Sequence, residues 1–101
     1  MAITKEKLQE LNAETAAIFL TAGMPLSEAQ LKALATAIRN GGFVFAGAGN
    51  TGPKGGLATV SASAIRALVR RHLLAEGISS DGGYMARLSE SALERLTTLA
   101  R

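Results

Sequence analysis

The stretch Ser61–Leu74, SASAIRALVRRHLL, combines a clear helical pattern with three arginines. At 100° per residue, five mainly apolar positions share one face of a helix: Ile65, Leu68, Val69, His72 and Leu73. The opposite face carries Ser63, Arg66, Ala67, Arg70 and Arg71. Ser61 is a good N-cap after the β-branched pair Thr59-Val60. The pattern therefore predicts an amphipathic helix over residues 61–74 with an exposed arginine face.

The residues after this helix read as a β-hairpin. Two short segments of extended character, Ala75–Ile78 and Tyr84–Leu88, flank the turn-rich tip Ser79–Gly83. A further helix is predicted from Ser89, with Leu93, Leu96 and Leu99 as its apolar positions. The second half of the chain is thus expected to run helix, hairpin, helix.

Three segments together resemble bacterial winged helix-turn-helix regulators. They are Val60-Ser61, the run Ile65–Leu74 and the stretch from Tyr84 through Leu88-Ser89-Glu90 to Leu96. In those regulators the recognition helix has a sequence like LVRRGLL. The resemblance covers about the second half of the chain. It implies an α+β, mainly helical fold that is winged helix-turn-helix-like, with a recognition helix at 61–74, a wing at 75–88 and an extra N-terminal helix.

The chain departs from this family pattern in three places. His72 and Ala92 each stand where the family usually has glycine. In addition, the segment before Val60 is rich in glycine, where the family has the first helix of its helix-turn-helix. This last departure leaves open whether the Gly-rich segment 41–56 replaces that helix.

The distribution of charge favours a polyanionic partner. Residues 1–50 contain four bases and four acids, whereas residues 51–101 contain seven bases and four acids. No acid occurs between Glu28 and Glu76, and six basic residues fall in that interval. A tract of one sign creates a local positive field that attracts polyanions. The alternative interpretation is a solvated surface that keeps the protein soluble.

The sequence thus favours binding of double-stranded DNA by a transcriptional or plasmid- or phage-type regulator. A recognition helix enters the major groove, and arginine can bind guanine edges or phosphates. The candidate DNA-binding residues are Ser61, Ser63, Arg66, Arg70, Arg71, Lys54 and Arg87. The alternative is a winged-helix module whose arginine face binds an acidic protein. Basic and aromatic residues are not interleaved along the sequence, which disfavours stacking on single strands.

The N-terminal part is predicted to form two helices. The first spans Thr4–Ala22, within a 1–24 N-terminal unit, and its apolar stripe contains Leu8, Leu11, Thr15, Ile18 and Phe19. This helix is the expected homodimer contact, and the alternative is that it folds back on its own core. The second helix has Ser27 as N-cap and Gln30 completing a capping box. Its predicted buried stripe is Leu31, Leu34, Ala35 and Ile38, and Asn40-Gly41-Gly42 ends it.

The middle of the chain contains a short apolar run and a glycine-rich loop. Phe43–Phe45 is either a strand or a continuation of the preceding helix, and Leu57–Val60 is expected to form a strand that pairs with the wing. Gly47–Gly52 matches G-x-G-x-x-G, but the next residues, Pro53-Lys54-Gly55-Gly56, do not open a helix cleanly. A nucleotide- or phosphate-binding role for this loop is therefore the least favoured alternative.

The composition argues against several other classes of protein. There is no cysteine and only one histidine, so thiolate and His-rich metal sites are not expected. No convincing catalytic constellation is present, and we expect neither an enzyme nor a cofactor. The chain shows no signal peptide or membrane-spanning segment, and the cytoplasm is the expected location. At 101 residues, a single domain is predicted.

Overall fold

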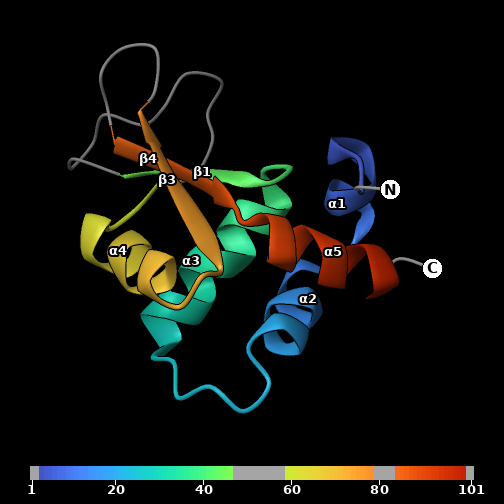
Figure 1. Ribbon diagram of the computed structural model, residues 1–101, viewed down its shortest axis with the longest axis horizontal. Coiled ribbons are helices and arrows are strands. Elements are labelled where there is room, and N and C mark those ends of the chain that lie inside the picture. Colours follow the sequence, from blue (N-terminus) through green and yellow to red (C-terminus); the bar gives the residue numbers. More distant parts are fainter. Residues whose placement is uncertain (1–2, 47–58, 79–83, 100–101) are drawn as a thin grey trace.

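The computed structural model describes residues 3–46, 59–78 and 84–99 (Figure 1). In chain order the elements are α1 (Lys5–Glu10), α2 (Ala13–Leu20), α3 (Glu28–Arg39), β1 (Phe43–Ala46), β2 (Thr59–Val60), α4 (Ala62–Arg70), β3 (Leu74–Ile78), β4 (Tyr84–Leu88) and α5 (Glu90–Leu99). The fold is therefore α+β, as expected. Figure 1 shows α4 and α1 at opposite ends of the molecule, with α3 between them.

The strands form one sheet in the order β2-β1-β4-β3. Strands β3 and β4 pair antiparallel from Leu74 opposite Leu88 to Ile78 opposite Tyr84, which confirms the predicted hairpin. Strand β1 pairs antiparallel with β4 and parallel with β2. The expectation that residues 57–60 pair with the wing is wrong, because β1 lies between β2 and the hairpin.

Helix α3 begins and ends as its sequence predicts. The Ser27 N–H donates to Gln30 Oε1 and the Gln30 N–H donates to Ser27 Oγ, both at 3.2 Å, so the capping box is formed. At the other end, the Gly41 N–H donates to the Ile38 carbonyl and the Gly42 N–H to the Ala37 carbonyl. This is a Schellman motif, and Gly41 has the positive φ of 92° that it requires. The chain then enters β1, so the Phe43–Phe45 run is a strand.

Helix α4 begins as predicted but ends four residues early. Ser61 Oγ accepts from the Ala64 N–H, as an N-cap should. The Leu73 N–H donates to the Leu68 carbonyl and the His72 N–H donates to the Val69 carbonyl, which closes a second Schellman motif. His72 has φ 61° and is exposed, so its predicted place on the apolar face is wrong. Leu73 is buried by the turn that follows the helix, and Leu74 belongs to β3.

The predicted N-terminal helix is instead two short helices. Asn12 interrupts it, because its side chain accepts from the Thr15 N–H and caps α2. The break rotates the buried face, which is formed by Ala13, Ala16, Ala17 and Leu20. Of the predicted stripe, Leu8 is buried, Leu11 and Phe19 are half-buried, and Thr15 and Ile18 are exposed.

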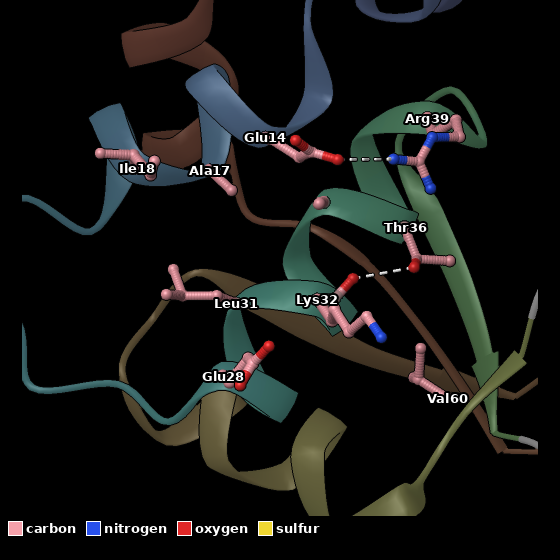
Figure 2. Close-up of a pocket in the computed structure, with 10 residues that line it drawn as sticks. Glu14, Ala17, Ile18, Glu28, Leu31, Lys32, Thr36, Arg39 and Val60 are labelled. Carbon is pink, nitrogen blue, oxygen red and sulfur yellow. Dashed lines mark hydrogen bonds and ion pairs between the residues drawn. The ribbon is translucent and has the colours of Figure 1, made fainter.

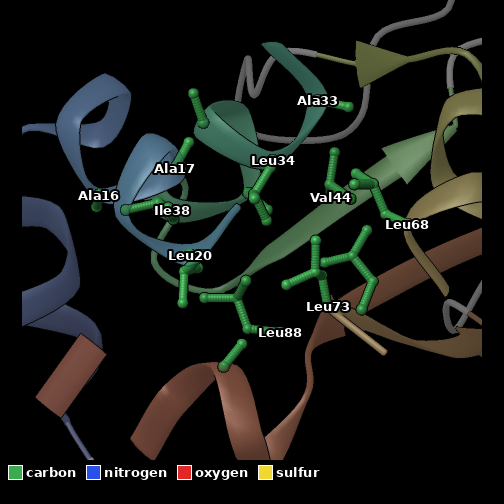
Figure 3. Packing of buried hydrophobic residues seen from close by; sticks show 14 of the residues in the cluster. Ala16, Ala17, Leu20, Ala33, Leu34, Ile38, Val44, Leu68, Leu73 and Leu88 are labelled. Carbon is green, nitrogen blue, oxygen red and sulfur yellow. The ribbon is translucent and has the colours of Figure 1, made fainter. Parts of the chain in front are cut away.

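One hydrophobic core joins the helices to the inner face of the sheet (Figure 3). Leu34 and Ile38 of α3 meet Leu20 from α2, Val44 from β1 and Leu68 from α4, and all five are fully buried. Burying a side chain of this size contributes about 1.5–3 kcal/mol relative to leaving it exposed. The arrangement fixes α4 against α3 and the hairpin through its apolar side.

Arg95 of α5 forms hydrogen bonds with the C-terminal end of α2. Its Nη1 and Nη2 donate to the carbonyls of Leu20 and Phe19 at 3.0 and 3.1 Å, at the end of α2. Its guanidinium carbon also lies 5.4 Å from the centroid of the Phe19 ring. A cation at a helix C-terminus satisfies carbonyls that have no partner within the helix. In the part of the chain that the structure describes, no helix has the length and apolar character needed to span a membrane.

Candidate nucleic-acid interface

The structure brings together five of the seven predicted site residues at α4, with Ser63, Arg66 and Arg70 on the helix and Ser61 and Arg71 at its N-cap and C-cap. Ser61, Ser63, Arg66, Arg70 and Arg71 are all exposed. Ile65 and Leu68, on the other side of the helix, have 0% of their surface exposed. The apolar stripe thus anchors the helix while the serines and arginines face solvent. We call these five residues the α4 face.

Arg66 is positioned by the hairpin. Its guanidinium carbon lies 5.9 Å from the centroid of the Tyr84 ring in β4, within range of a cation–π interaction. The Tyr84 hydroxyl is buried, and it makes no hydrogen bond with any described residue. Burial, together with the neighbouring Glu76 carboxylate, raises the pKa of Tyr84 above its ordinary value, while Arg66 opposes the rise. The phenol is therefore neutral at physiological pH.

A shallow hollow separates α4 from β3. It has a volume of about 220 Å³ and is lined by Ser63, Arg66, Val69, Arg70 and Glu76. Glu76 is a carboxylate at the edge of an otherwise basic surface. At low salt its charge partly offsets the field of the two arginines.

Glu76 and Tyr84 were not among the predicted site residues. Their place follows from strand alternation, because Leu74 and Ala86 face the core and residues two apart share a face. Glu76 pairs with Ala86 across the hairpin, and Tyr84 packs against the core on the same side. The hairpin register, taken together with the helix, would have predicted both contacts.

The remaining two predicted residues do not join the α4 face. Arg87 is exposed, but it alternates with the buried Ala86 and Leu88 and so lies on the opposite face of the sheet. Its neighbours across the strands are Phe43 and Ala75. Lys54 lies outside the described residues, as does the Gly47–Gly52 loop.

A larger groove lies between α2 and α3, with Val60 of β2 at its edge (Figure 2). Its volume is about 750 Å³, and its lining includes Ile18, Leu31 and Val60. Ile18 is 62% exposed although it is a large apolar side chain. Glu14 and Arg39 face each other across one end at 3.9 Å, with both side chains largely exposed. Such a surface ion pair contributes about 0–1 kcal/mol.

Within the described ranges, no cluster of three or more His, Asp or Glu side chains is placed to hold a metal ion. Comparisons with protein-family models, with curated proteins and with solved structures found no match to this chain.

Proposed function

We propose that this protein binds double-stranded DNA through the α4 face, with α4 as a recognition helix and the β3–β4 hairpin as a wing. The observation that carries the proposal is the α4 face itself. Three exposed arginines and two exposed serines lie on α4 or at its two caps, and the helix contains no acidic residue. Arginine and serine side chains bond both to phosphates and to base edges.

The order of the elements supports a winged-helix arrangement. From α3 onward the chain runs through β1, the short β2, α4 and then the antiparallel hairpin, with β1 added to the sheet beside β4. Helix α4 packs against α3 and the hairpin, so its opposite side is free of both. An α-helix fits the major groove, and the hairpin next to it is placed to reach the neighbouring backbone.

Contacts from Arg66, Arg70 and Arg71 to phosphates would make the binding sensitive to salt. Neutralising phosphates releases counterions, so log K falls linearly with log[salt], with a slope near −0.9 for each phosphate neutralised. We expect a slope of about −2 to −3 if each of these arginines makes one such contact. Fluorescence anisotropy with a labelled duplex of mixed sequence, measured over a range of salt concentrations, tests this. Failure of the duplex to bind at low salt would contradict the proposed function.

We further propose that the DNA-binding form is a homodimer whose contact includes α2. Ile18 and the groove beside it support this, because an exposed large apolar side chain next to a hollow suits a protein contact. The groove also carries both signs of charge, with Glu14 and Glu28 beside Lys32 and Arg39. A two-fold contact can therefore pair each acid with a base of the second copy.

A further inference from the structure

The outer face of the sheet has side chains unlike those of its inner face. The outward positions of the three longer strands are Phe43 and Phe45 on β1, Met85 and Arg87 on β4, and Ala75 and Gly77 on β3. The two phenylalanines and Met85 are only partly buried, and they do not belong to the hydrophobic core. The helices that pack on these strands, α3 and α4, contribute to the core on the inner face. We call this surface the outer sheet face.

The aromatic residues on this face are in contact with each other and with a cation. The rings of Phe43 and Phe45 have centroids 5.5 Å apart and planes at 83°, an edge-to-face pair. Lys5 Nζ lies 5.6 Å from the centroid of the Phe43 ring. Lys5 reaches this position by passing over Gly41, where a Cβ would come within 2.5 Å of Lys5 Cγ. The close approach of Lys5 therefore depends on the glycine.

The charge on the outer sheet face has one sign. Arg87 is exposed and is the cross-strand partner of Phe43, whose ring also lies under Lys5 Nζ. None of the six outward strand positions named above carries a carboxylate, because Glu76 lies on the inner side beside Arg66. Ala75 and Gly77, across the strands from Arg87 and Met85, add little or no side chain to this face. The face thus combines aromatic rings, small residues and positive charge.

We propose that the outer sheet face binds single-stranded nucleic acid, with bases stacking on Phe43 and Phe45 and with Lys5 and Arg87 binding the phosphates. Aromatic rings next to cations on a sheet are suited to unpaired bases, whose flat faces are accessible. In a duplex those faces are stacked inside the helix. A purely apolar partner would leave Lys5 and Arg87 without counter-charges. This site is separate from the α4 face and does not depend on the proposed duplex binding.

The direct test uses a tryptophan as reporter. The chain contains no tryptophan, so Phe45→Trp introduces a single fluorophore on the outer sheet face. Titration with an oligothymidylate of about twelve nucleotides should quench its fluorescence to saturation, because bases stacked on an indole quench it. No change in fluorescence at low salt would overturn the proposal.

Two double variants test whether single-stranded and duplex nucleic acid bind at different surfaces. Phe43→Leu with Phe45→Leu keeps apolar side chains but removes the rings, and should weaken oligothymidylate binding by at least about tenfold. Duplex binding should be unchanged. Arg66→Ala with Arg70→Ala should leave oligothymidylate binding unchanged. The proposal is overturned if the leucine variant, shown to be folded by circular dichroism, retains wild-type affinity, or if the alanine variant loses single-strand binding. Should the leucine variant not fold, the tryptophan titration decides.

Discussion

His72 shows how a single backbone angle ends helix α4. Its φ of 61° is in the left-handed region, which costs a residue with a Cβ about 1–2 kcal/mol. The position is held by the Schellman bonds and by Ser89 Oγ, which donates to the His72 carbonyl at 2.6 Å. Glycine adopts this angle without strain but loses more entropy on folding. We therefore expect His72→Gly to raise the free energy of unfolding by about 1 kcal/mol.

Urea denaturation checks this as a higher midpoint at an unchanged slope. His72→Ala is the matched control, because alanine also has a Cβ and should bring no such gain. A glycine variant that is less stable than the wild type would show that the imidazole itself stabilises the turn.

The end of α4 also shows what the sequence could and could not predict at this scale. The apolar stripe continues through Leu73, and Leu73 is indeed buried. Periodicity cannot tell whether such a leucine extends the helix or closes its C-terminal motif, since both bury it.

At the scale of elements, start signals predicted better than periodicity. The caps at Ser27 and Ser61 and the turn-rich hairpin tip are local features, and the elements they predicted are present. In the N-terminal region, the spacing of Leu8, Leu11 and Ile18 fits one continuous helix. The side chain of Asn12 and the packing of Ala16 against the core select two. Helix propensity cannot predict whether this region forms one helix or two, because tertiary packing decides between them.

The N-terminal helices are expected to be required for folding. Deleting residues 1–22 removes α1 and α2, and with them Leu8 and Leu20, which are 2% and 0% exposed. It also leaves Arg95 without the two carbonyls that it binds. Each large apolar side chain lost from the core costs about 2–5 kcal/mol, comparable to the stability of a small domain. Circular dichroism should therefore show no cooperative unfolding transition in the truncated chain. A cooperative unfolding transition in the truncated chain would mean that α1 and α2 are not required for folding.

The sequence could not predict the pairing of strands that lie far apart in the chain. The parallel pairing of β2 with β1 and the meeting of Lys5, Phe43 and Arg87 join residues far apart in the chain. The sequence predicted neither the outer sheet face nor the place of Arg87 on it. Basic and aromatic residues are not interleaved along the chain, but Arg87 is the cross-strand partner of Phe43, and Lys5 of α1 lies over the Phe43 ring.

At the scale of the whole molecule, Ile18 allows the proposed homodimer to be tested without disturbing the fold. Ile18→Glu places a charge where the side chain is 62% exposed, so the monomer should keep its stability. A buried charge without a partner is costly at an interface, so the dimer should dissociate at least about tenfold more readily. Sedimentation equilibrium measures this. A wild-type chain that remains monomeric at high micromolar concentration would contradict the dimer.

The central claim is that the α4 face binds duplex DNA, and one comparison of affinities tests it most directly. Arg66→Ala with Arg70→Ala removes two exposed charges from α4, and Lys5→Ala with Lys7→Ala removes two exposed charges from α1, at the opposite end of the molecule. By duplex anisotropy over a range of salt concentrations, the α4 variant should bind at least about tenfold more weakly at low salt, with a salt slope smaller by about 1–2. The α1 variant should bind nearly as the wild type does. Equal losses in the two variants, or wild-type affinity in the α4 variant, would contradict the claim.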